Sequence, residues 1–365
     1  MDKLRTGGGI QLYRLAKELS RREHNVTALF ADNPEFNGDF EIFKDTGVIL
    51  KFMKLNKIKL NPSSIKSLIE FRRFIQEENF DIIHCHKGKA TTFAYFATLG
   101  LDVSLISNRG VTSPIGFWRS IKYKNEKIKK IIAVSKAVKD VLVNDAGIPE
   151  EKIEVVYGSV DTGEFKPGIK STLRKEFNLV KDSKVIGFVG NAGERKGLPY
   201  LIESFKILLK THSNIYLILV GIEREQLKQF ALPPQVTSFV ITTGFRKDVP
   251  NLMAGFDIFA FSGISDEGLT GTVREAASCG IPIVTTDVAG NGELIRNKVS
   301  GLVVPIKDPE RMAEAFDFLF KNYGKAKEFG VKAREIVLKK MTDQNRTSRI
   351  EKIYYQARKD KPEVK

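Results

Sequence analysis

Short apolar runs alternate with helix-like segments along nearly the whole chain, and this alternation constrains the fold more than any other feature. Alternation of this kind builds parallel sheets that are covered by helices on both faces. The sequence therefore predicts an α/β fold of two Rossmann-like, doubly wound parallel sheets. In the first half we predict strands at residues 24–30, 80–84, 103–107, 131–134 and 153–156. In the second half we predict strands at residues 184–189, 215–220, 236–242, 258–261, 281–285 and 301–304.

The chain is long enough for two domains, each with its own core, because it has 365 residues of which 42% are hydrophobic. A Gly- and Pro-bearing stretch at residues 157–168 suits a flexible linker. We therefore predict an N-terminal domain over residues 1–160 and a C-terminal domain over 161–340. Residues 337–356 have a helical pattern, so 341–365 are expected to form a terminal helix and tail.

The chain is strongly basic: it has 59 Lys and Arg residues against 44 Asp and Glu residues, which gives a net charge of +15. The basic residues concentrate at 51–73, 119–130 and 321–359, where apolar residues recur at helical spacing. Each run alone fits an ordinary exposed helix face better than a basic amphipathic helix. Their sum favours an acidic partner. We expect an anionic glycan or membrane surface rather than nucleic acid.

Cysteine usage is compatible with a reducing compartment. Cys85 and Cys279 are the only cysteines, and they lie far apart in sequence, which argues against a disulfide framework. Residues 1–9 do not resemble a signal peptide, and no apolar run approaches the roughly 20 residues that span a bilayer. The sequence predicts a cytoplasmic protein, with peripheral attachment to the inner face of the cytoplasmic membrane as one expectation. It contains neither a nucleophile elbow nor a clustered Cys/His zinc set.

Two glutamates, Glu267 and Glu275, flank the predicted start of a helix that Thr270 or Thr272 could cap. A helix start offers unpaired N–H groups and a partial positive charge, which favour a phosphate. Carboxylates beside it can accept hydrogen bonds from sugar hydroxyls. The pattern suits a nucleotide sugar, although spacing alone fits a capped surface helix with two solvated glutamates equally well.

A second candidate loop follows the predicted strand 184–189. It spans residues 190–197, contains glycines, and carries Arg195 and Lys196 just before a helix. Glycine lets the backbone approach a ligand, and the two cations can neutralise a diphosphate. The loop is not the phosphate loop of ATPases, because Gly197 rather than Ser or Thr follows Lys196. Basic pairs at helix starts are often only solvated, so this signal is weak by itself.

Four segments together resemble glycosyltransferase family 4, the group 1 enzymes that retain anomeric configuration and have the two-domain GT-B fold. They are residues 190–197, 267–275, 131–135 and 300–305, and they occur in the family's order. The resemblance implies two Rossmann-like sheets that face each other across a catalytic cleft, because ligands of such sheets bind at the carboxyl ends of the strands. It also implies that the terminal helix returns to pack on the first domain.

The resemblance assigns roles in the second domain. Arg195 and Lys196 would stabilise the departing diphosphate, and Glu267 would contact the donor sugar. Glu275 would accept the ribose hydroxyls. Neither a metal ion nor another cofactor would be required. Further contacts to the nucleotide sugar would come from Gly190, Leu269, Thr270, Gly271 and Thr272.

In the first domain, His86 matches the family's cleft histidine, which orients a donor hydroxyl, whereas His84 is expected to be a core or supporting residue. Arg109 and Lys136 are expected on the acceptor side. Relatives carry histidine and glycine around the position of Arg109, whereas this chain reads Ser-Asn-Arg-Gly-Val-Thr-Ser-Pro over residues 107–114. The departure indicates a different, anionic acceptor.

Residues 7–9, three glycines, resemble the family's glycine-rich loop, in which Gly8 and Gly9 would let backbone amides approach the donor phosphates. A helix is predicted to follow at residues 11–21. The family places an apolar first strand just before this loop, and this sequence lacks one. If Met1 is the true start, and not the result of a misplaced or truncated one, the first domain is expected to lack its central strand, which would leave backbone groups of the neighbouring strands unpaired.

The expected function is transfer of a hexose-type sugar, with retention, from a nucleoside diphosphate sugar to a glycan or glycolipid such as lipopolysaccharide core. Two alternatives stay open from sequence. A nucleotide-sugar epimerase or hydrolase could use the same scaffold. A non-catalytic basic protein that binds polyanions would explain the charge but not the Glu267/Glu275 spacing.

Overall fold

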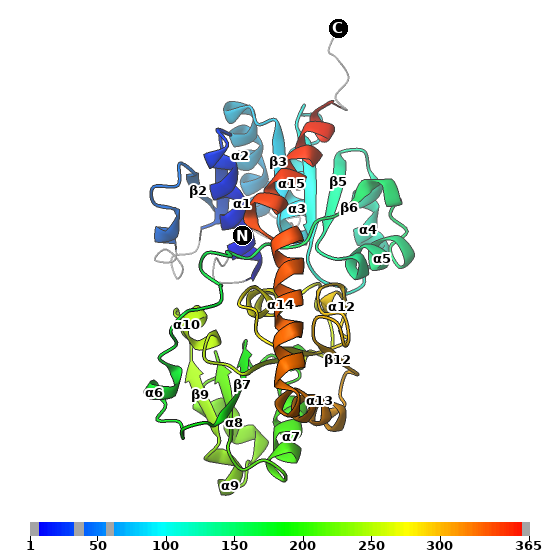
Figure 1. Cartoon of the computed structure of the whole chain (residues 1–365). Helices are drawn as coiled ribbons and strands as arrows, with labels where there is room; N and C mark the ends of the chain where they lie inside the picture. The colour runs from blue at the N-terminus through cyan, green and yellow to red at the C-terminus, as the bar shows by residue number, and fades with distance from the viewer. Residues whose placement is uncertain (1–6, 33–39, 56–61, 360–365) are drawn as a thin grey trace. The chain divides into compact units, whose positions relative to one another are not determined.

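The computed structural model describes residues 7–32, 40–55 and 62–359 of the chain (Figure 1). The chain divides into unit 1, Met1–Ser159 with Asp343–Lys365, and unit 2, Val160–Thr342. The sequence placed the limits after residues 160 and 340. Each unit is built from parallel strands with helices between them, so the predicted α/β class is confirmed.

Unit 2 contains one six-stranded parallel sheet in the order β12-β11-β10-β7-β8-β9. Its strands are β7 (Lys184–Val189), β8 (Ile215–Val220), β9 (Val240–Gly244), β10 (Ile258–Phe261), β11 (Ile283–Thr286) and β12 (Leu302–Val304). Its helices of eight or more residues are α7 (Leu198–Leu209), α11 (Gly271–Ser278), α13 (Pro309–Lys321) and α14 (Tyr323–Lys340). Its shorter helices are α6 (Leu173–Glu176), α8 (Arg224–Leu227), α9 (Pro234–Thr237), α10 (Val249–Met253), α12 (Asn291–Leu294), η3 (Glu194–Lys196) and η4 (Lys228–Phe230).

The central strands of unit 2 are apolar along both faces, as strands covered by helices on both sides must be. All four residues of β10 are buried, and so are the last five of β7. Gly187 in β7 admits the Phe256 ring, which lies 2.1 Å from where a Cβ would stand. A larger residue at this position would displace that ring, so the glycine is required by close packing rather than by backbone conformation.

Unit 1 differs, because its strands form two separate parallel sheets within the described residues: β1-β2, and β3-β4-β5-β6. The strands are β1 (Thr27–Ala31), β2 (Ile49–Met53), β3 (Ile82–Cys85), β4 (Ser104–Arg109), β5 (Ile128–Ala133) and β6 (Ile153–Val155). The helices are α1 (Gly7–Arg21), α2 (Pro62–Glu78), α3 (Gly88–Ala97), α4 (Phe117–Lys124), α5 (Lys136–Asn144), η2 (Glu150–Lys152) and α15 (Asp343–Lys359).

Three sequence expectations for secondary structure are wrong in detail. Residues 7–9 are the first turn of α1 rather than a loop ahead of it. Strand β2 was not predicted, because it is an edge strand with three exposed residues and so lacks a clean apolar run. Strand β9 begins at Val240 rather than at residue 236, because Pro233 and Pro234 open the short helix α9 ahead of it.

The predicted terminal helix at residues 337–356 is two helices. Helix α14 ends at Lys340 and α15 begins at Asp343. Met341 leaves helical geometry, and its carbonyl accepts a hydrogen bond from Val160 N–H at 2.9 Å. The backbone therefore pairs with another segment at the break instead of continuing the helix.

Helix α15 packs on unit 1, beside α1 and across the sheet. Ile350, Ile353 and Ala357 are buried in one apolar cluster with Leu15 and Leu19 of α1. At the edge of this contact, Glu351 accepts hydrogen bonds from Arg22 at 2.9 Å and pairs with His24 at 2.6 Å. The last helix is therefore an integral part of the unit 1 core, although it lies far from that unit in sequence.

The predicted linker at residues 157–168 is anchored rather than freely exposed. Phe165 is buried in unit 2, and its carbonyl accepts a hydrogen bond from the Ser278 hydroxyl at 2.5 Å.

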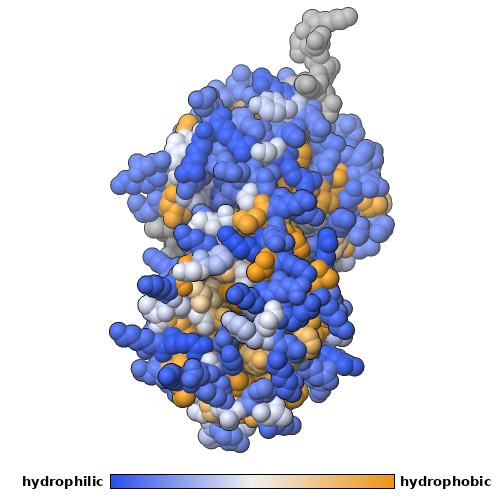
Figure 2. All heavy atoms as spheres, in the orientation of Figure 1, coloured by the Kyte–Doolittle hydropathy of each residue, from blue (hydrophilic) through white to orange (hydrophobic). Residues whose placement is uncertain are grey.

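Around these cores the surface is polar. Figure 2 shows a mostly hydrophilic face on which hydrophobic residues occur in small separate groups.

Candidate functional site

The predicted cation and glutamate of unit 2 meet where two neighbouring strands end. Lys196 follows β7, and Glu267 follows β10, which pairs with β7 in the sheet. The Lys196 ammonium donates to Glu267 Oε1 across 2.8 Å, and both side chains are partly buried. The same ammonium lies 5.1 Å from the centre of the Phe261 ring. Sequence-distant groups of opposite charge thus converge at the carboxyl edge of the sheet, where open parallel sheets bind ligands.

Backbone contacts lock these two loops together. Ile264 N–H donates to the Arg195 carbonyl at 2.9 Å, and the Ser262 hydroxyl donates to the Lys196 carbonyl at 2.9 Å. Gly197 has a left-handed backbone with φ of 63°, and an added Cβ would lie 1.9 Å from the Ser262 carbonyl oxygen. Only glycine fits this crossing. Arg195 is exposed to solvent.

The start of α11 lies in the same region. Thr270 occupies the N-cap position, but its hydroxyl accepts no capping bond from the helix, so the expected side-chain cap is wrong. Within the described residues, the hydroxyls of Thr270 and Thr272 are buried and have no hydrogen-bond partner. Buried hydroxyls normally find hydrogen-bond partners, and a pair without them at a helix start fits a phosphate ligand.

Glu275 lies in the second turn of α11 and is partly exposed. The residue before it, Arg274, is buried and donates to the Leu269 carbonyl at 2.7 Å. This bond holds the loop ahead of α11 against the helix.

Gly190, at the end of β7, packs against Gly221. A Cβ added at Gly221 would lie 2.4 Å from the Gly190 carbonyl oxygen. The backbone itself therefore forms the surface between β7 and β8.

Sequence reasoning missed Asn291, the first residue of α12. Its side chain is fully buried, accepts a hydrogen bond from Thr270 N–H at 3.1 Å and donates to the Thr285 hydroxyl at 3.1 Å. It therefore orients the start of α11 from the neighbouring strand end. The signal was available, because Asn291 stands between Gly290 and Gly292 shortly after the predicted strand 281–285.

In unit 1 the three predicted residues follow adjacent strands. His86 comes after β3, Arg109 ends β4, and Lys136 begins α5 just after β5. Because β3, β4 and β5 are neighbours and parallel, all three lie along one carboxyl edge. Helix α5 is capped there by Ser135, whose hydroxyl accepts from Val138 N–H at 3.2 Å. These residues and those around Lys196 belong to different units.

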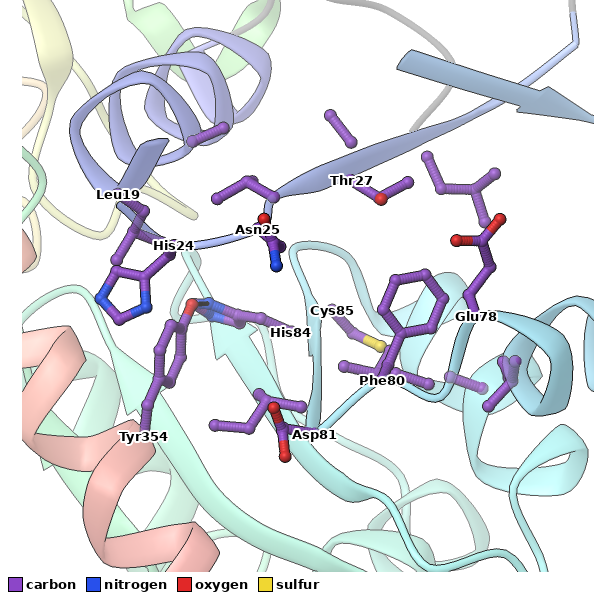
Figure 3. Close-up of a pocket in the computed structure, with 18 of the residues that line it drawn as sticks. Leu19, His24, Asn25, Thr27, Glu78, Phe80, Asp81, His84, Cys85 and Tyr354 are labelled. Atoms are coloured by element: carbon purple, nitrogen blue, oxygen red, sulfur yellow. Dashed lines mark hydrogen bonds between the residues drawn. The ribbon is translucent and has the colours of Figure 1, made fainter. Parts of the chain in front are cut away.

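His86 is the end of a chain of hydrogen bonds that begins on α15. The Tyr354 hydroxyl lies 2.6 Å from His84 Nδ1 (Figure 3). On the other side of the ring, His84 Nε2 lies 3.1 Å from Asn108 Oδ1. The Asn108 amide nitrogen lies 3.1 Å from His86 Nδ1. Burial, partly offset by the Asn108 hydrogen bond and reinforced by the charge of Arg346, lowers the pKa of His84 to about 3.

The imidazole of His86 shows the same behaviour. Burial, and next the neighbouring His84, lower the pKa of His86 well below its ordinary value. Both rings are thus neutral at physiological pH and act as hydrogen-bonding groups rather than as cations. His84 has the supporting position that the sequence suggested.

Arg109 holds its own loop, because its guanidinium donates to the Ser113 carbonyl. It is also part of a cationic group. Burial, and then the charges of Arg119 and Arg109, lower the pKa of Lys122 to about 8. The positive charges of Lys122, Arg119 and Arg109 repel one another, and an anionic ligand would reduce this repulsion.

Gly8 and Gly9 lie in the first turn of α1, where Gly9 is buried. Their amides belong to the helix start, so the predicted backbone role now rests on helix geometry instead of loop flexibility.

No group of three or more His, Cys, Asp or Glu side chains in the described part of the chain is arranged to hold a metal ion. The described helices include none long and apolar enough to cross a membrane.

Comparison with known protein families decides the assignment. The profile described as Glycosyltransferase Family 4 matches residues 5–164, and that described as Glycosyl transferases group 1 matches residues 169–336. This chain is a family 4, group 1 glycosyltransferase. The first match ends at residue 164 and the second begins at residue 169, so the enzyme carries the family pattern in both units. The predicted family and the predicted GT-B class of fold are confirmed.

Individual relatives are distant. The glycosyltransferase is 23% identical over 272 residues to the UDP-Gal:alpha-D-GlcNAc-diphosphoundecaprenol alpha-1,3-galactosyltransferase of Escherichia coli, with 69% of each chain covered. Among solved structures, a glycosyltransferase from Rickettsia africae ESF-5 is similar with a TM-score of 0.85 at 21% identity, covering 98% of this chain and 96% of that one. Anabaena Alr3699/HepE in complex with UDP-glucose is similar with a TM-score of 0.81 at 21% identity, covering 98% of both chains. These structural likenesses support the fold.

Proposed function

We propose that this glycosyltransferase is a retaining hexosyltransferase that moves a hexose-type sugar from a nucleoside diphosphate sugar to a hydroxyl of a glycan or glycolipid. One observation carries the proposal: the ion pair of Lys196 and Glu267 joins the loop after β7 to the loop after β10, and the second loop leads to the start of α11, where Thr270 and Thr272 have buried hydroxyls. The cation and helix amides suit a diphosphate, whereas the carboxylate suits sugar hydroxyls. A donor that carries both groups satisfies the whole arrangement.

The proposed reaction breaks the bond between the anomeric carbon and the phosphate oxygen. The acceptor oxygen forms its new bond on the same face of the sugar, and the departing phosphate oxygen takes the acceptor proton. Positive charge develops on the sugar and negative charge on the diphosphate, so stabilising the diphosphate is the main catalytic task. Lys196, Arg195 and the first amides of α11 would supply that stabilisation without a metal ion.

The remaining residues would orient the donor. Glu267 would accept from a sugar hydroxyl after Lys196 turns to the phosphate, and Glu275 would accept from the ribose. His86, neutral and fixed through Asn108, would hold another sugar hydroxyl. Gly190 would allow close approach of the nucleotide.

Two similar proteins indicate which donor to test first. The Anabaena neighbour was solved with UDP-glucose, and the E. coli relative is named for a UDP-Gal donor and a diphosphoundecaprenol-linked acceptor. We therefore propose a UDP-hexose donor and an anionic glycolipid acceptor in cell-envelope glycan synthesis, with lipopolysaccharide core as one such acceptor. The cationic group of Arg109, Arg119 and Lys122 fits an acceptor that carries phosphate or carboxylate.

The test combines a panel of UDP-, GDP- and ADP-sugars with lipid-linked and phosphorylated glycan acceptors. We expect thermal stabilisation by one donor, transfer only with acceptor, and a product whose anomeric configuration by NMR matches the donor. Conversion of the donor without acceptor would instead favour an epimerase or hydrolase. Salt-sensitive binding of polyanions that Lys196→Ala leaves unchanged, with no donor binding, would favour a non-catalytic binding protein.

We also propose that the glycosyltransferase acts at the inner face of the cytoplasmic membrane and that α4 contacts the lipid. Phe117 is 68% exposed and Trp118 is 83% exposed, and Ile121 is exposed on the next turn. Arg119, Lys122 and Lys124 belong to the same helix. Exposed aromatic rings next to cations are typical of helices that lie in the headgroup region of anionic membranes.

Vesicle flotation checks this contact. Trp118→Ala should reduce binding to vesicles with anionic lipid by roughly tenfold, and neutral vesicles should bind weakly. The matched control is Tyr323→Ala in unit 2, an aromatic residue that is 69% exposed. If both substitutions have the same effect, α4 is not the contact surface.

A further inference from the structure

The second turn of α1 is held by two hydrogen bonds from one side chain. The Gln11 amide nitrogen donates to the Ser159 carbonyl at 2.7 Å, and the Gln11 amide oxygen accepts from the Ser159 N–H at 2.7 Å. A side-chain amide both donates and accepts, whereas a carboxylate only accepts and an ammonium only donates. The pairing with both backbone groups of one residue therefore depends on the chemistry of glutamine at position 11.

Ser159 gives this contact a firm support. It is buried, and it follows β6 at a point where the backbone still pairs with the sheet, since Val156 N–H donates to the Ala133 carbonyl of β5 at 2.9 Å. The Ser159 carbonyl also accepts from Arg14 Nη1, one turn further along α1, at 3.3 Å. Two side chains of α1 therefore attach the helix to a segment that continues from the four-stranded sheet.

A buried side chain of α15 contacts the same turn. The Arg346 guanidinium donates to the Gln11 carbonyl at 2.9 Å. Burial lowers the pKa of Arg346 to about 10, and the charge of Arg14 acts in the same direction, while Asp343 offsets part of the effect. Two cations thus lie about one turn from a helix start that has a partial positive charge of its own. An anion bound at that start would be favourable.

We propose that Gln11 is a positioning residue of the glycosyltransferase, which fixes the first turn of α1 so that the amides of Gly8 and Gly9 are aligned for the donor diphosphate. The inference rests on the proposed function, because it requires a donor that carries phosphate. Gly8 and Gly9 precede Gln11 by three and two positions in the same helix. A bond that holds Gln11 therefore limits their movement as well.

The first turn of α1 needs such an anchor because it consists of glycines. Glycine has the largest conformational freedom of all residues and a poor helix propensity, and it has no side chain with which to hold itself. If this turn frays in the free enzyme, the donor has to order it on binding, and affinity is lost. The chemical step itself is not changed. Loss of the Gln11 bonds should therefore raise the KM for donor more than it lowers turnover.

The experiment compares the full-length enzyme with three variants. Gln11→Met keeps the length of the side chain and removes both hydrogen bonds, whereas Gln11→Glu keeps the acceptor and removes the donor. Gln, Glu and Met have similar helix propensities, and a carboxylate early in a helix is favourable, so neither change weakens α1 by itself. Gln76→Met, at an exposed position of α2, is the matched control.

Amide hydrogen exchange is the first measurement, and it needs no donor. In Gln11→Met, the amides of Leu12, Tyr13 and Arg14 should exchange at least about tenfold faster, whereas those of β4 and β5 should not change. This result would show that the first turns of α1 are released while the rest of unit 1 stays folded. Gln76→Met should leave the α1 amides as they are in the unmodified enzyme.

Binding and kinetics are the second measurement. In Gln11→Met, the Kd for UDP by calorimetry and the KM for the donor identified by the panel should rise by roughly 10- to 100-fold. Turnover at saturating donor should fall by less than about threefold. Gln11→Glu should lie between the unmodified enzyme and Gln11→Met, because it keeps one of the two bonds. A role in helix stability alone would instead leave Gln11→Glu at least as good as glutamine.

Two outcomes in the variants would overturn the inference. Faster exchange in α1 with an unchanged Kd for UDP would make Gln11 a structural residue only. A fall in turnover as large as the rise in KM would show that Gln11 acts on the chemical step and not on donor alignment. Failure of the proposed function is recognised separately, because the unmodified enzyme would then bind no UDP-, GDP- or ADP-sugar, and the inference would fall with it.

Discussion

The two units use the same strand and helix plan but differ in how their sheets are held together. In unit 2 one sheet of six strands is continuous, and the loops at its carboxyl edge are hydrogen-bonded to each other through Arg195, Ser262 and Asn291. In unit 1 the sheet is divided and a cavity lies between its parts. The difference teaches that the loops around Lys196 in unit 2 are held by contacts between neighbouring strand ends, whereas His84 and His86 in unit 1 are held by side chains that include Tyr354 of the distant helix α15.

The largest effect is expected at the ion pair of unit 2. Lys196→Ala should lower turnover by roughly 100- to 1,000-fold, because it removes the charge placed to stabilise the leaving diphosphate. Steady-state kinetics with the donor identified by the panel would measure it. The matched control is Lys206→Ala, which removes a lysine of unit 2 paired with Glu203 on the exposed side of α7. Equal turnover of the two variants would refute the assignment of Lys196.

A backbone test of the same unit comes next. Gly197→Ala should destabilise unit 2 by roughly 2–4 kcal/mol, because the new Cβ would meet the Ser262 carbonyl and alanine disfavours a positive φ. Chemical denaturation, monitored by amide exchange in β7 and β10, would measure the loss of unit 2 stability. Gly324→Ala is the control, since an added Cβ has no neighbour within 4 Å there. A Gly197→Ala protein as stable as the control would mean that the two loops are not locked.

Acid is expected to destabilise unit 1 more than unit 2. The pKa of His84 is lowered to about 3 in the folded protein, against 6.5 for an ordinary histidine. The unfolded chain therefore binds more protons between these values, so unit 1 is stable above pH 6.5 and loses stability as the pH falls below it. The loss should reach about 1–2 kcal/mol by pH 5. Exchange of β4 and β5 amides should rise relative to those of β7 and β8, and equal acid sensitivity of both units would contradict this.

The smallest effect is expected at the junction of α15 with the rest of unit 1. Tyr354→Phe removes the hydroxyl that lies 2.6 Å from His84, at a cost of about 1 kcal/mol in unit 1 stability. If His86 is oriented through this chain, the KM for donor should rise while turnover changes less. Tyr355→Phe, at the next position and 53% exposed, is the control. A Tyr354→Phe enzyme with unchanged stability and KM would remove α15 from the site.

The fold was largely predictable from sequence because buried parallel strands are continuous apolar runs. The bounds of β7, β8 and β10 were predicted to the residue, since helices cover both of their faces. Strand β2 was missed because an edge strand keeps exposed residues among its apolar ones. The start of α1 was misplaced because three glycines predict a loop by propensity, and tertiary contacts override propensity here.

The candidate site was predictable only where the residues are close to strand ends in sequence. Lys196 and Glu267 could be selected individually, but their pairing could not, since it depends on β7 and β10 being neighbours in the sheet. The link from Tyr354 to His84 spans 270 positions, and no local pattern encodes it. Asn291 was overlooked because its role lies in bonds to Thr270 and Thr285 rather than in a ligand-binding motif.

The hydrogen bond between Val160 and Met341 has a practical consequence. It brings the first residue of unit 2 next to the second-last, so the ends of this half of the protein are adjacent. A compact body whose ends meet can be cut out and inserted elsewhere with little rearrangement. Residues 160–342 therefore form a natural cassette, which could be produced alone for calorimetry.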